Sequence, residues 1–522
     1  MLLSQILPTV ARMQPDRDAM KDRHGSYTYE QVLCYANSVA YGLRELGVKP
    51  GDRIVLLSDP SPSLAIAECA AIAIGAIPVG IFPGLARDEI VQIVRDADPI
   101  AIVYDSENAK ISECVETLSI IHPIPVRSTQ SRPSIASFIS DSPQLTLWHQ
   151  ASPDDVALII YTGGTTGRSK GVMHSHRGIA SWSFLNPERG GGHNKTKKSL
   201  VPNQAHLTGQ FILWTTLFEG GCLVYPDTYP LQAEEAVRLI EREQLKSIGT
   251  VGLLFKDIVR LLTQRDTPIP YVEGISCGGT PFGETTFKQA REVFPNAHLI
   301  EVYSQTESGQ FISFVSINDC FALGTPDRIL SVGNPKHTEY WGQRPFEVRI
   351  VDESGQDVEE GAFGEVICRG EQLMLGYWNN PEETSNALRN GWLHTGDIGQ
   401  FDKDGFLYLL DRKKDIVIVG GSNVYGSEVE EALSTHPAIE EVAVIGTPLP
   451  DDGEEVTAVI VVKEHAELSL EELRVWCAGR LAVYKLPTRL AITDTLARTS
   501  VGKLNKAEIR KPYWQGRMRM IN

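Results

Sequence analysis

The sequence lacks paired cysteines. Its eight cysteines stand singly along the 522 residues, with no CxxC pair and no spacing typical of a disulfide framework. An isolated cysteine is most often a small buried apolar side chain. We therefore expect reduced thiols in a cytoplasmic protein, at Cys34, Cys69, Cys114, Cys222, Cys277, Cys320, Cys368 and Cys477.

A leader and a membrane span are also lacking. No basic region precedes the N-terminal apolar run, which a proline and an arginine interrupt, and this argues against a signal peptide. The longest apolar stretch, Leu64 to Pro83, is broken by a glutamate, a glycine and a proline. A bilayer span needs about 20 predominantly apolar residues. The stretch therefore predicts a buried helix that leads into a parallel strand.

An excess of positive charge is missing as well. The chain has 49 basic and 66 acidic residues, a formal net charge of −17. This balance argues against binding nucleic acid or an anionic membrane through the overall field. A local basic cluster could still hold a small anion, because charges beyond about 8 Å are screened at physiological salt.

Two patterns divide the chain. Up to about residue 410, short Val/Ile-rich runs alternate with helical patterns, as expected for βαβ units and parallel sheets. The runs "FEVRIV", "GEVICRG" and "GFLYLLDRKKDIVIVGG" indicate antiparallel strands. After Asp411 the order helix, strand, strand, helix predicts a small α+β domain of ordinary size. We place the boundary between domains 1–411 and 412–522.

The stretch "IIYTGGTTGRSKGVMHSH", from Ile159 to His176, combines an apolar run with a Gly/Thr/Ser loop and a lysine. Such a loop presents backbone N–H groups and hydroxyls without bulky side chains, which suits a phosphate. It is not a Walker A loop, because no Gly-Lys-[Ser/Thr] follows its first glycine at the required spacing. A plain surface loop is the alternative.

The loop "YTGGTTGRSKG" resembles the signature loop of the adenylate-forming superfamily, which includes the acyl-CoA synthetases. Further motifs of that superfamily follow in order along the whole chain. They are "PNQAHLTGQF", "CGGTP", "EVYSQTE", "GYWNNPEET", "GWLHTGDIG", "DRKKDIVIVGGSNVYGSEVE" and "RTSVGK". The resemblance implies an α/β fold: a large N-terminal domain of several subdomains with parallel βαβ sheets and a distorted antiparallel barrel, and a small mobile α+β C-terminal domain.

The resemblance also implies the chemistry. A carboxylate is already ionised at neutral pH, so its attack on the α-phosphorus of ATP needs no general base. The reaction needs cancellation of anionic repulsion and stabilisation of pyrophosphate. By resemblance, Thr306 contacts phosphate, Glu307 binds Mg²⁺, and Lys503 bridges the carboxylate and the α-phosphate. Phosphate-loop residues implied in the same way are Thr162, Gly163, Gly164, Thr165, Thr166, Gly167 and Lys170.

Other residues are assigned by the same resemblance. Tyr303 lies against adenine, and Asp397 with Arg412 binds the ribose. Lys414 is a hinge residue, and Gly420 with Gly421 lines the entry for the pantetheine arm of coenzyme A. The remaining nucleotide-binding residues are Gly278, Gly279, Thr280 and Ser304. Taken alone, Glu307 could instead cap a helix, and Lys503 could be a solvated turn residue.

The acyl site is expected around His206, which resembles a residue that gates the acyl pocket. Leu207, Thr208, Gly278, Val302 and Ser304 should lie near the acyl group, and Val302 stands where many relatives with long or planar substrates have glycine. We expect a monocarboxylic acid of modest size, aromatic or medium-chain aliphatic.

Two further histidines form a His-x-His pair, His174 and His176. Two ligands without a third nearby are weak support for a metal site. We expect both histidines at the surface, and His394 to pack beside the "TGD" segment.

These residues predict an AMP-forming acid–thiol ligase that uses ATP, Mg²⁺ and coenzyme A. An adenylation enzyme that loads a separate carrier protein is an alternative. A catalytically inactive, nucleotide-responsive binding module is another, which the joint presence of the charged site residues disfavours.

Overall fold

The computed structural model describes most of the chain in two compact units. They are residues 1–347 with 368–393, and residues 348–367 with 394–522. Within these ranges the described residues are 2–127, 132–141, 148–162, 169–184, 198–251, 253–278, 282, 284–309, 311–335, 346–419, 422–449, 454–464, 466–478, 480–499 and 502–515.

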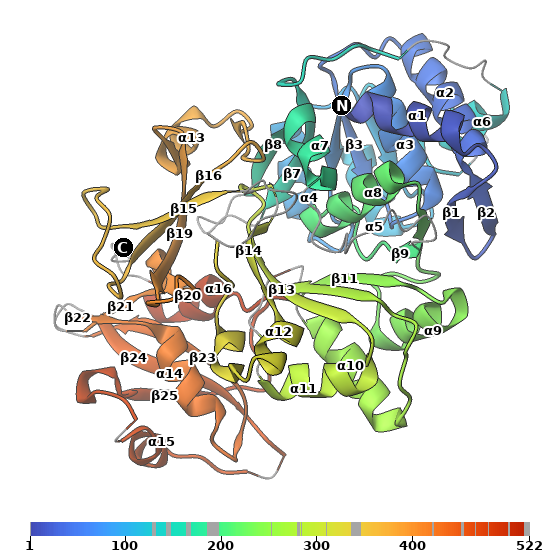
Figure 1. The fold of residues 1–522 in the computed structure, drawn as a ribbon. Helices are drawn as coiled ribbons and strands as arrows, with labels where there is room; N and C mark the ends of the chain where they lie inside the picture. The colour runs from blue at the N-terminus through green and yellow to red at the C-terminus, as the bar shows by residue number, and fades with distance from the viewer. Residues whose placement is uncertain are drawn as a thin grey trace. The chain divides into compact units, whose positions relative to one another are not determined.

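The first unit contains a seven-stranded sheet in the order β17-β8-β7-β4-β3-β5-β6 (Figure 1). The five strands from β7 to β6 in this order are parallel, whereas β8 and β17 run antiparallel to their neighbours. The strands are β3 (Arg53–Leu57), β4 (Ile77–Gly80), β5 (Ala101–Tyr104), β6 (His122–Pro125), β7 (Val156–Thr162), β8 (Lys170–Ser175) and β17 (Gly376–Tyr377).

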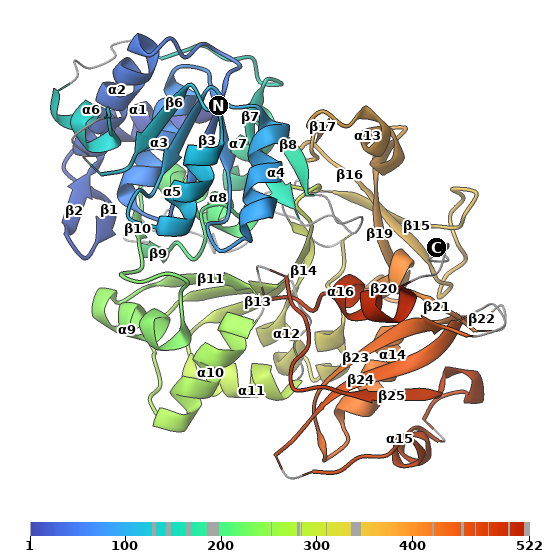
Figure 2. The same ribbon diagram turned by 180° about the vertical axis from the view of Figure 1, so that it is seen from behind.

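Helices cover both faces of this sheet, which explains why its strands are apolar throughout rather than alternating. Val55, Leu57 and Ile102 pack against α4 (Arg87–Ala97) and α5 (Ala109–Thr117), and Figure 2 shows these two helices on the near face. Ile54 and Val103 belong to the core on the opposite face. Helices that supply this second core are α1 (Leu3–Met13), α2 (Tyr29–Glu45), α3 (Pro62–Ala73), α6 (Ile135–Asp141), α7 (His176–Phe184) and α8 (Leu207–Glu219).

Helix α3 occupies the long apolar stretch seen in the sequence. The Ser61 hydroxyl accepts a hydrogen bond from the N–H of Leu64 (3.3 Å) and so caps the helix. Gly75 turns the chain with a φ of 77°, and β4 follows. The prediction of a buried helix leading into a parallel strand is confirmed. None of the helices in the described part of the chain is long and apolar enough to cross a membrane.

An eight-stranded sheet, in the order β14-β13-β12-β11-β9-β10-β1-β2, completes the first unit. Met20 in β1 lies opposite Leu223 in β10, so the N-terminal hairpin joins strands from much later in the chain. Figure 1 shows α9 (Ala233–Glu243), α10 (Leu253–Arg265) and α11 (Glu284–Val293) along one face of this sheet. Its strands are β1 (Asp18–Asp22), β2 (Gly25–Thr28), β9 (Lys198–Leu200), β10 (Cys222–Val224), β11 (Ser247–Val251), β12 (Gly274–Gly278), β13 (His298–Ser304) and β14 (Phe311–Ser316), and α12 (Ile317–Ala322) follows.

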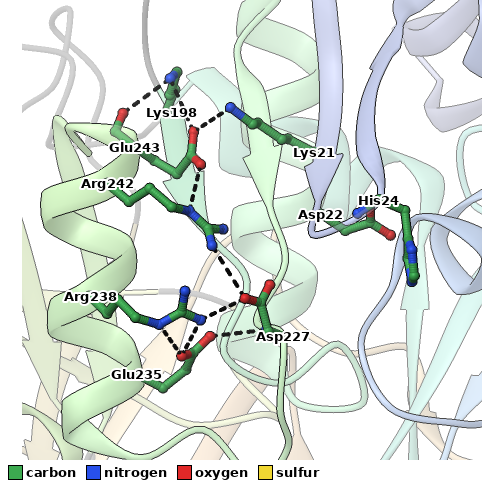
Figure 3. Close-up of polar contacts among 9 residues, drawn as sticks. All are labelled: Lys21, Asp22, His24, Lys198, Asp227, Glu235, Arg238, Arg242 and Glu243. Carbon is green, nitrogen blue, oxygen red and sulfur yellow. Dashed lines mark hydrogen bonds and ion pairs between the residues drawn. The ribbon is translucent and has the colours of Figure 1, made fainter.

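A charged network ties the N-terminal hairpin to the end of α9 (Figure 3). The Glu243 carboxylate, 3% exposed, receives Lys21 from β1 at 2.8 Å and Lys198 from β9 at 3.4 Å. Arg242 bridges Glu243 (3.0 Å) and Asp227 (3.2 Å). Burial would raise the pKa of Glu243, but the surrounding cations hold that pKa below its ordinary value. The charges are mutually compensated, so the network is structural.

The second unit ends in a small α+β core with the predicted order helix, strand, strand, helix. Strands β23 (Ile439–Pro448) and β24 (Glu454–Val462) pair antiparallel, and β25 (Arg489–Ile492) lies parallel to β24. Helices α14 (Gly426–Ser434) and α15 (Leu470–Cys477) bury their apolar residues in the same core. The hairpin β21 (Val417–Val419) and β22 (Ser422–Val424) precedes it, and α16 (Lys506–Arg510) follows.

A five-stranded sheet contains the strands that the sequence indicated between residues 346 and 412. Its order is β15-β16-β19-β18, with β20 paired to β19, and the unit boundary passes through three of these strands. Helix α13 (Pro381–Ala387) lies between β17 and β18 in the chain. The strands are β15 (Glu347–Val351), β16 (Gly364–Arg369), β18 (Leu388–Arg389), β19 (Trp392–Phe401) and β20 (Leu407–Arg412).

All eight cysteines are free thiols, and seven of them are buried. Burial raises the pKa of Cys69 and of Cys277, which keeps both thiols protonated at neutral pH. The prediction of mostly buried cysteines is confirmed.

Candidate functional site

The signature loop joins β7 and β8, which form an antiparallel pair. Thr162 ends β7 and lies opposite Lys170, the first residue of β8. The two predicted phosphate-binding residues at the ends of the loop are therefore neighbours across the hairpin. Gly163, Gly164, Thr165, Thr166 and Gly167 lie outside the described residues.

Lys170 lies against two residues of a later segment. Its side chain is 17% exposed and forms an ion pair with Glu383, in the first turn of α13. Its Nζ also lies 5.0 Å from the centroid of the Tyr377 ring, within the range of a cation–π contact. Strand β17 brings Tyr377 there, because Tyr377 pairs with Val172 of β8.

Tyr377 links this lysine to the predicted magnesium ligand. Its hydroxyl donates a hydrogen bond to Oε1 of Glu307 (2.9 Å). Its N–H donates to Oγ1 of Thr384 (2.9 Å), which fixes the start of the segment. One tyrosine therefore contacts both Lys170 and Glu307, the cation and the carboxylate of the predicted phosphate site.

The turn that carries Thr306 and Glu307 is held by a hydrogen bond within the turn and by one from a later segment of the chain. The Ser308 hydroxyl accepts from the N–H of Gln305 (3.0 Å), and the Glu307 carbonyl accepts from the N–H of Met374 (2.9 Å). Gly309 has a φ of 77°, and a Cβ there would lie 2.3 Å from the Gln372 carbonyl oxygen. Only glycine fits this position. The half-buried carboxylate of Glu307 is therefore held on a defined turn.

The residues expected near adenine and the acyl group lie where β12 and β13 end. Gly278 lies opposite Val302, and a Cβ on Gly278 would come within 2.6 Å of Cγ2 of Val302. Tyr303 is buried, and Ser304 is half-buried at the end of β13. The structure thus brings Gly278, Val302 and Ser304 to one edge of the sheet. Gly279 and Thr280 lie outside the described residues.

His206 stands at the amino end of α8. Its Nδ1 accepts a hydrogen bond from the N–H of Thr208 (3.3 Å), so the imidazole caps the helix. Leu207 is buried and Thr208 is half-buried in the first turn. The three residues of the predicted acyl-pocket segment therefore share one helix start.

Asp397 and Arg412, in the second unit, face each other across β19 and β20. Nε of Arg412 lies 2.8 Å from Oδ1 of Asp397, and Nη1 donates to the carbonyl of Thr395 (3.1 Å). The Asp397 side chain is 10% exposed and that of Arg412 is 46% exposed. This placement leaves part of the guanidinium accessible to a polar ligand.

Lys414 follows on a short 3₁₀ turn. Its carbonyl accepts a hydrogen bond from Nη1 of Arg510 (3.2 Å), and Arg510 also pairs with Asp415 (2.8 Å). Burial lowers the pKa of Lys414, opposed by the neighbouring Asp415 carboxylate. Gly420 and Gly421 lie outside the described residues.

Lys503 follows a tight turn near the end of the chain. Its carbonyl accepts from the N–H of Thr499 (2.7 Å), and Gly502 adopts a φ of 83°. Arg498 donates to the Gly502 carbonyl (3.0 Å) and forms an ion pair with Glu441 (2.6 Å). These contacts hold the turn on β23.

The expectation that His174 and His176 lie at the surface is wrong. His174 is fully buried in β8, which lies between β7 and β17, and its ring packs edge-on against Trp182 (5.7 Å between centroids). His176 is 3% exposed. Burial lowers the pKa of His174 to about 3 and that of His176 to about 4. Both are neutral packing residues at pH 7. His394 is half-buried within 3.2 Å of Glu365.

The donor set fits a magnesium-bound nucleotide phosphate. Mg²⁺ in such sites is held by one or two carboxylates together with phosphate oxygens, and Glu307 would supply one carboxylate. Lys170, whose Nζ lies 5.0 Å from the centroid of the Tyr377 ring, would supply a cation for the phosphates. Among the described residues, no group of three histidine, cysteine, aspartate or glutamate side chains forms an all-protein metal site.

Sequence reasoning missed Tyr377 and Glu383. Both belong to "GYWNNPEET", a segment that resembled the superfamily but received no role. The sequence signal that could have pointed to them was a tyrosine and two glutamates close together in one segment. The strand in that segment, β17, pairs with β8, which lies much earlier in the chain. Only the fold places them beside Lys170 and Glu307.

Comparisons with known proteins identify the family of the chain. A family model described as AMP-binding enzyme matches residues 7–378, and one described as AMP-binding enzyme C-terminal domain matches residues 428–503. A feruloyl-CoA synthase of Amycolatopsis is 29% identical over 96% of this chain and 97% of its own. A long-chain-fatty-acid–CoA ligase of Bacillus subtilis is 30% identical over 96% and 93%.

The solved structures include a close match in fold. The amide bond synthetase McbA of Marinactinospora thermotolerans superposes with a TM-score of 0.86 at 27% identity, covering 98% of this chain and 99% of its own. The matched family covers most of both units and every motif between the signature loop and Tyr377. The chain therefore belongs to the AMP-binding enzyme family.

Proposed function

We propose that this protein is an AMP-forming carboxylate–CoA ligase. A carboxylate oxygen of the acid attacks the α-phosphorus of ATP, and pyrophosphate leaves. The thiol of coenzyme A then attacks the carbonyl carbon of the acyl-adenylate, loses its proton, and AMP leaves. Relatives named as CoA ligases, at 29–30% identity over nearly the whole chain, support this reading.

One observation carries the proposal. Tyr377 contacts Lys170 through its ring and Glu307 through its hydroxyl. A cation and a carboxylate joined in this way suit a phosphate whose charge is shared between a lysine and a metal ion. The reaction requires that combination, because two anions must approach each other and pyrophosphate must depart.

The phosphate half of the site comes from the first unit. Lys170 and the loop that begins at Thr162 bind the β- and γ-phosphates, Thr306 contacts phosphate, and Glu307 binds Mg²⁺. When bound, Mg²⁺ neutralises charge on the phosphate oxygens. The ion pair with Glu383 holds Lys170 near this position before ATP arrives. The loop residues in this role are Gly163, Gly164, Thr165, Thr166 and Gly167.

For the nucleoside, the proposal keeps the roles that the resemblance implies. Tyr303 packs against adenine, supported by Gly278, Gly279, Thr280 and Ser304. Asp397 accepts hydrogen bonds from the ribose hydroxyls, with Arg412 fixing its orientation at 2.8 Å. Lys503 neutralises the acid carboxylate and the α-phosphate together, which an ammonium suits as a compact point charge.

The second half-reaction uses the joint between domains 1–411 and 412–522, a boundary that we keep as part of the proposal. Lys414 is the hinge residue, and Gly420 and Gly421 line the path of the pantetheine arm. Hinges need only a few residues that absorb the backbone change. Free coenzyme A is the acceptor, with a separate carrier protein as the alternative. The cytoplasm, which supplies ATP and coenzyme A, is the expected compartment.

The acid is a monocarboxylic acid of modest size, aromatic or medium-chain aliphatic. The side chain of Val302 fills the space over Gly278. The acyl pocket is therefore narrower at this wall than it would be with glycine at position 302. By resemblance, the segment from His206 to Thr208 lines the same acyl pocket. A named feruloyl-CoA synthase among the relatives supports the aromatic class.

The test is pyrophosphate release from ATP and Mg²⁺ across a panel of carboxylic acids. Each acid is assayed with coenzyme A, with a simple amine, and with neither, beside the Lys503→Ala variant. We expect release that accelerates with coenzyme A for aromatic or medium-chain acids and collapses in the variant. The amine is included because a solved relative is an amide bond synthetase.

Other outcomes overturn parts of the proposal. Release of about one equivalent per enzyme, unaffected by coenzyme A, indicates a retained adenylate and points to a carrier protein. Acceleration by the amine alone indicates amide synthesis. Comparable turnover of malonate or a long-chain fatty acid contradicts the proposed acid class. No release with any acid contradicts the ligase and favours the inactive binding module.

A further inference from the structure

A buried carboxyl group lies beside the predicted acyl-pocket segment. Glu68, in the middle of α3, is 1% exposed. Its carboxylate accepts three hydrogen bonds: from Nε2 of Gln204 (2.7 Å), Nε2 of Gln210 (3.1 Å) and Nε1 of Trp214 (3.2 Å). None of these four residues belongs to the nucleotide site described above. A carboxylate is rarely buried unless it is paired or has a function.

The three donors belong to the segment that carries His206. Gln204 lies two residues before His206, and Gln210 and Trp214 lie one turn apart on the same face of α8. Nε2 of Gln210 also donates to the carbonyl of Gln204 (2.8 Å), which closes the segment around His206. The carboxylate therefore holds both the turn that precedes the helix and the helix itself.

Other residues of this segment pack against strands of both sheets of the first unit. The Phe211 ring lies edge-on to Phe311 of β14, with centroids 5.3 Å apart. Ile212 contacts the backbone of Gly249 in β11, where a Cβ would come within 2.9 Å of its Cδ1. A Cβ on Gly80 of β4 would lie 3.0 Å from Cα of Ala205. The segment has no room to shift without moving these contacts.

No charged side chain in the described part of the chain is among the causes that shift the pKa of Glu68. Burial raises its pKa to about 7, against the three hydrogen bonds that favour the ionised form. The neighbouring titratable groups are Cys69 on the same helix and Tyr225 after β10, and burial raises the pKa of both. Glu68 therefore acts on its surroundings through hydrogen bonds.

We propose that Glu68 is a positioning residue for acid recognition: it fixes residues 204–210 through Gln204 and Gln210, and so sets His206, Leu207 and Thr208 against the acyl group. The inference rests on the proposed function, because the acid is the ligand that this segment would contact. Glu68 touches neither the acid nor the nucleotide. Its loss is expected to change recognition of the acid and to leave recognition of ATP unchanged.

The test compares four proteins in the pyrophosphate assay: wild type, Glu68→Gln, Gln204→Leu and Glu243→Gln. Glu68→Gln keeps the shape and one acceptor oxygen, whereas Gln204→Leu cuts the link on the side of the segment. Glu243→Gln is the matched control, because Glu243 is an equally buried carboxylate with three basic partners in the network of Figure 3. Thermal unfolding of each variant reports stability separately.

We expect Gln204→Leu to raise the KM for the acid about tenfold, with the KM for ATP within about twofold of wild type. Glu68→Gln should raise the KM for the acid by only about threefold, because the amide keeps one acceptor oxygen. Glu243→Gln should lower the unfolding temperature and change neither KM.

Three results would overturn the proposal. Equal changes in both KM values, or changes that track unfolding temperature across all variants, indicate a structural role only. Unchanged KM for the acid in Gln204→Leu and Glu68→Gln contradicts positioning while leaving the ligase intact. A wild-type protein without acid-dependent pyrophosphate release contradicts the proposed function and this inference together.

Discussion

The sharpest prediction concerns the Tyr377 hydroxyl. The Tyr377→Phe change removes the hydrogen bond to Oε1 of Glu307 and keeps the ring beneath Lys170. A hydrogen bond to a charged acceptor contributes about 1.5–3 kcal/mol, and the half-buried position of Glu307 favours the lower part of that range. We therefore expect kcat/KM for magnesium–ATP to fall about 10- to 30-fold, which corresponds to roughly 1.4–2 kcal/mol.

The measurement is pyrophosphate release against Mg²⁺ concentration, together with calorimetric binding of ATP with and without Mg²⁺. The variant should need more Mg²⁺ for half-maximal rate and should lose affinity for ATP only when Mg²⁺ is present. Tyr377→Leu should lose about a further fivefold, since it also removes the cation–π contact of ~1 kcal/mol.

Tyr271→Phe is the matched control. Its hydroxyl donates to the carbonyl of Ile240 (3.1 Å), and Tyr271 precedes β12 at the end of the strand away from Gly278. That variant should keep wild-type kinetics. Wild-type Mg²⁺ dependence in Tyr377→Phe would refute the idea that Tyr377 orients the Glu307 carboxylate.

Three further predictions concern other parts of the molecule. Asp397→Asn should raise the KM for ATP about tenfold, because a hydrogen bond to a charged acceptor weakens; an unchanged KM would argue against a role at the ribose. Lys506→Met should destabilise the protein by about 3 kcal/mol in urea unfolding, because Glu430 (2.9 Å) and Asp411 (3.8 Å) lose their buried cation; wild-type stability would contradict this. Between pH 5 and 7 the folded protein retains a proton on Glu68, whose pKa is about 7, that the unfolded chain has lost, so this group's contribution to stability falls by about 2 kcal/mol as the pH rises. Glu68→Gln should remove that decline in the urea midpoint, and an unaltered slope would be inconsistent with the raised pKa.

Local patterns were sufficient to predict much of the fold. The βαβ alternation places β3, β4 and β5 with their helices because each unit is short, and the buried helix α3 follows from composition and capping. Two pairings were out of reach: β1 with β10, and the two-residue strand β17 with β8. Such pairings depend on the register between distant segments, which no local pattern encodes.

The same division holds for the candidate site. Thr162, Lys170 and Glu307 could be named from motifs, and those assignments remain predictions. The link through Tyr377 could not be predicted, since it requires β17 to lie on β8. His174 and His176 were misjudged because the lack of a third metal ligand was taken to favour the surface, whereas His174 lies in β8, which is paired on both edges, and His176 begins α7 with its side chain buried.

The pairing of Met20 with Leu223 has a consequence for synthesis of the chain. The N-terminal hairpin leaves the ribosome long before its partner strand β10, which follows only after all the inner strands of the seven-stranded sheet. Until β10 has been made, the edge of β1 that faces away from β2 carries unpaired backbone N–H and C=O groups. Such an edge can pair with strands of other chains. A sheet whose strands are far apart in the sequence folds slowly, because long loops must be closed before the strands can pair. When β8 has been made, the seven-stranded sheet lacks only β17, whereas the eight-stranded sheet has only its first hairpin.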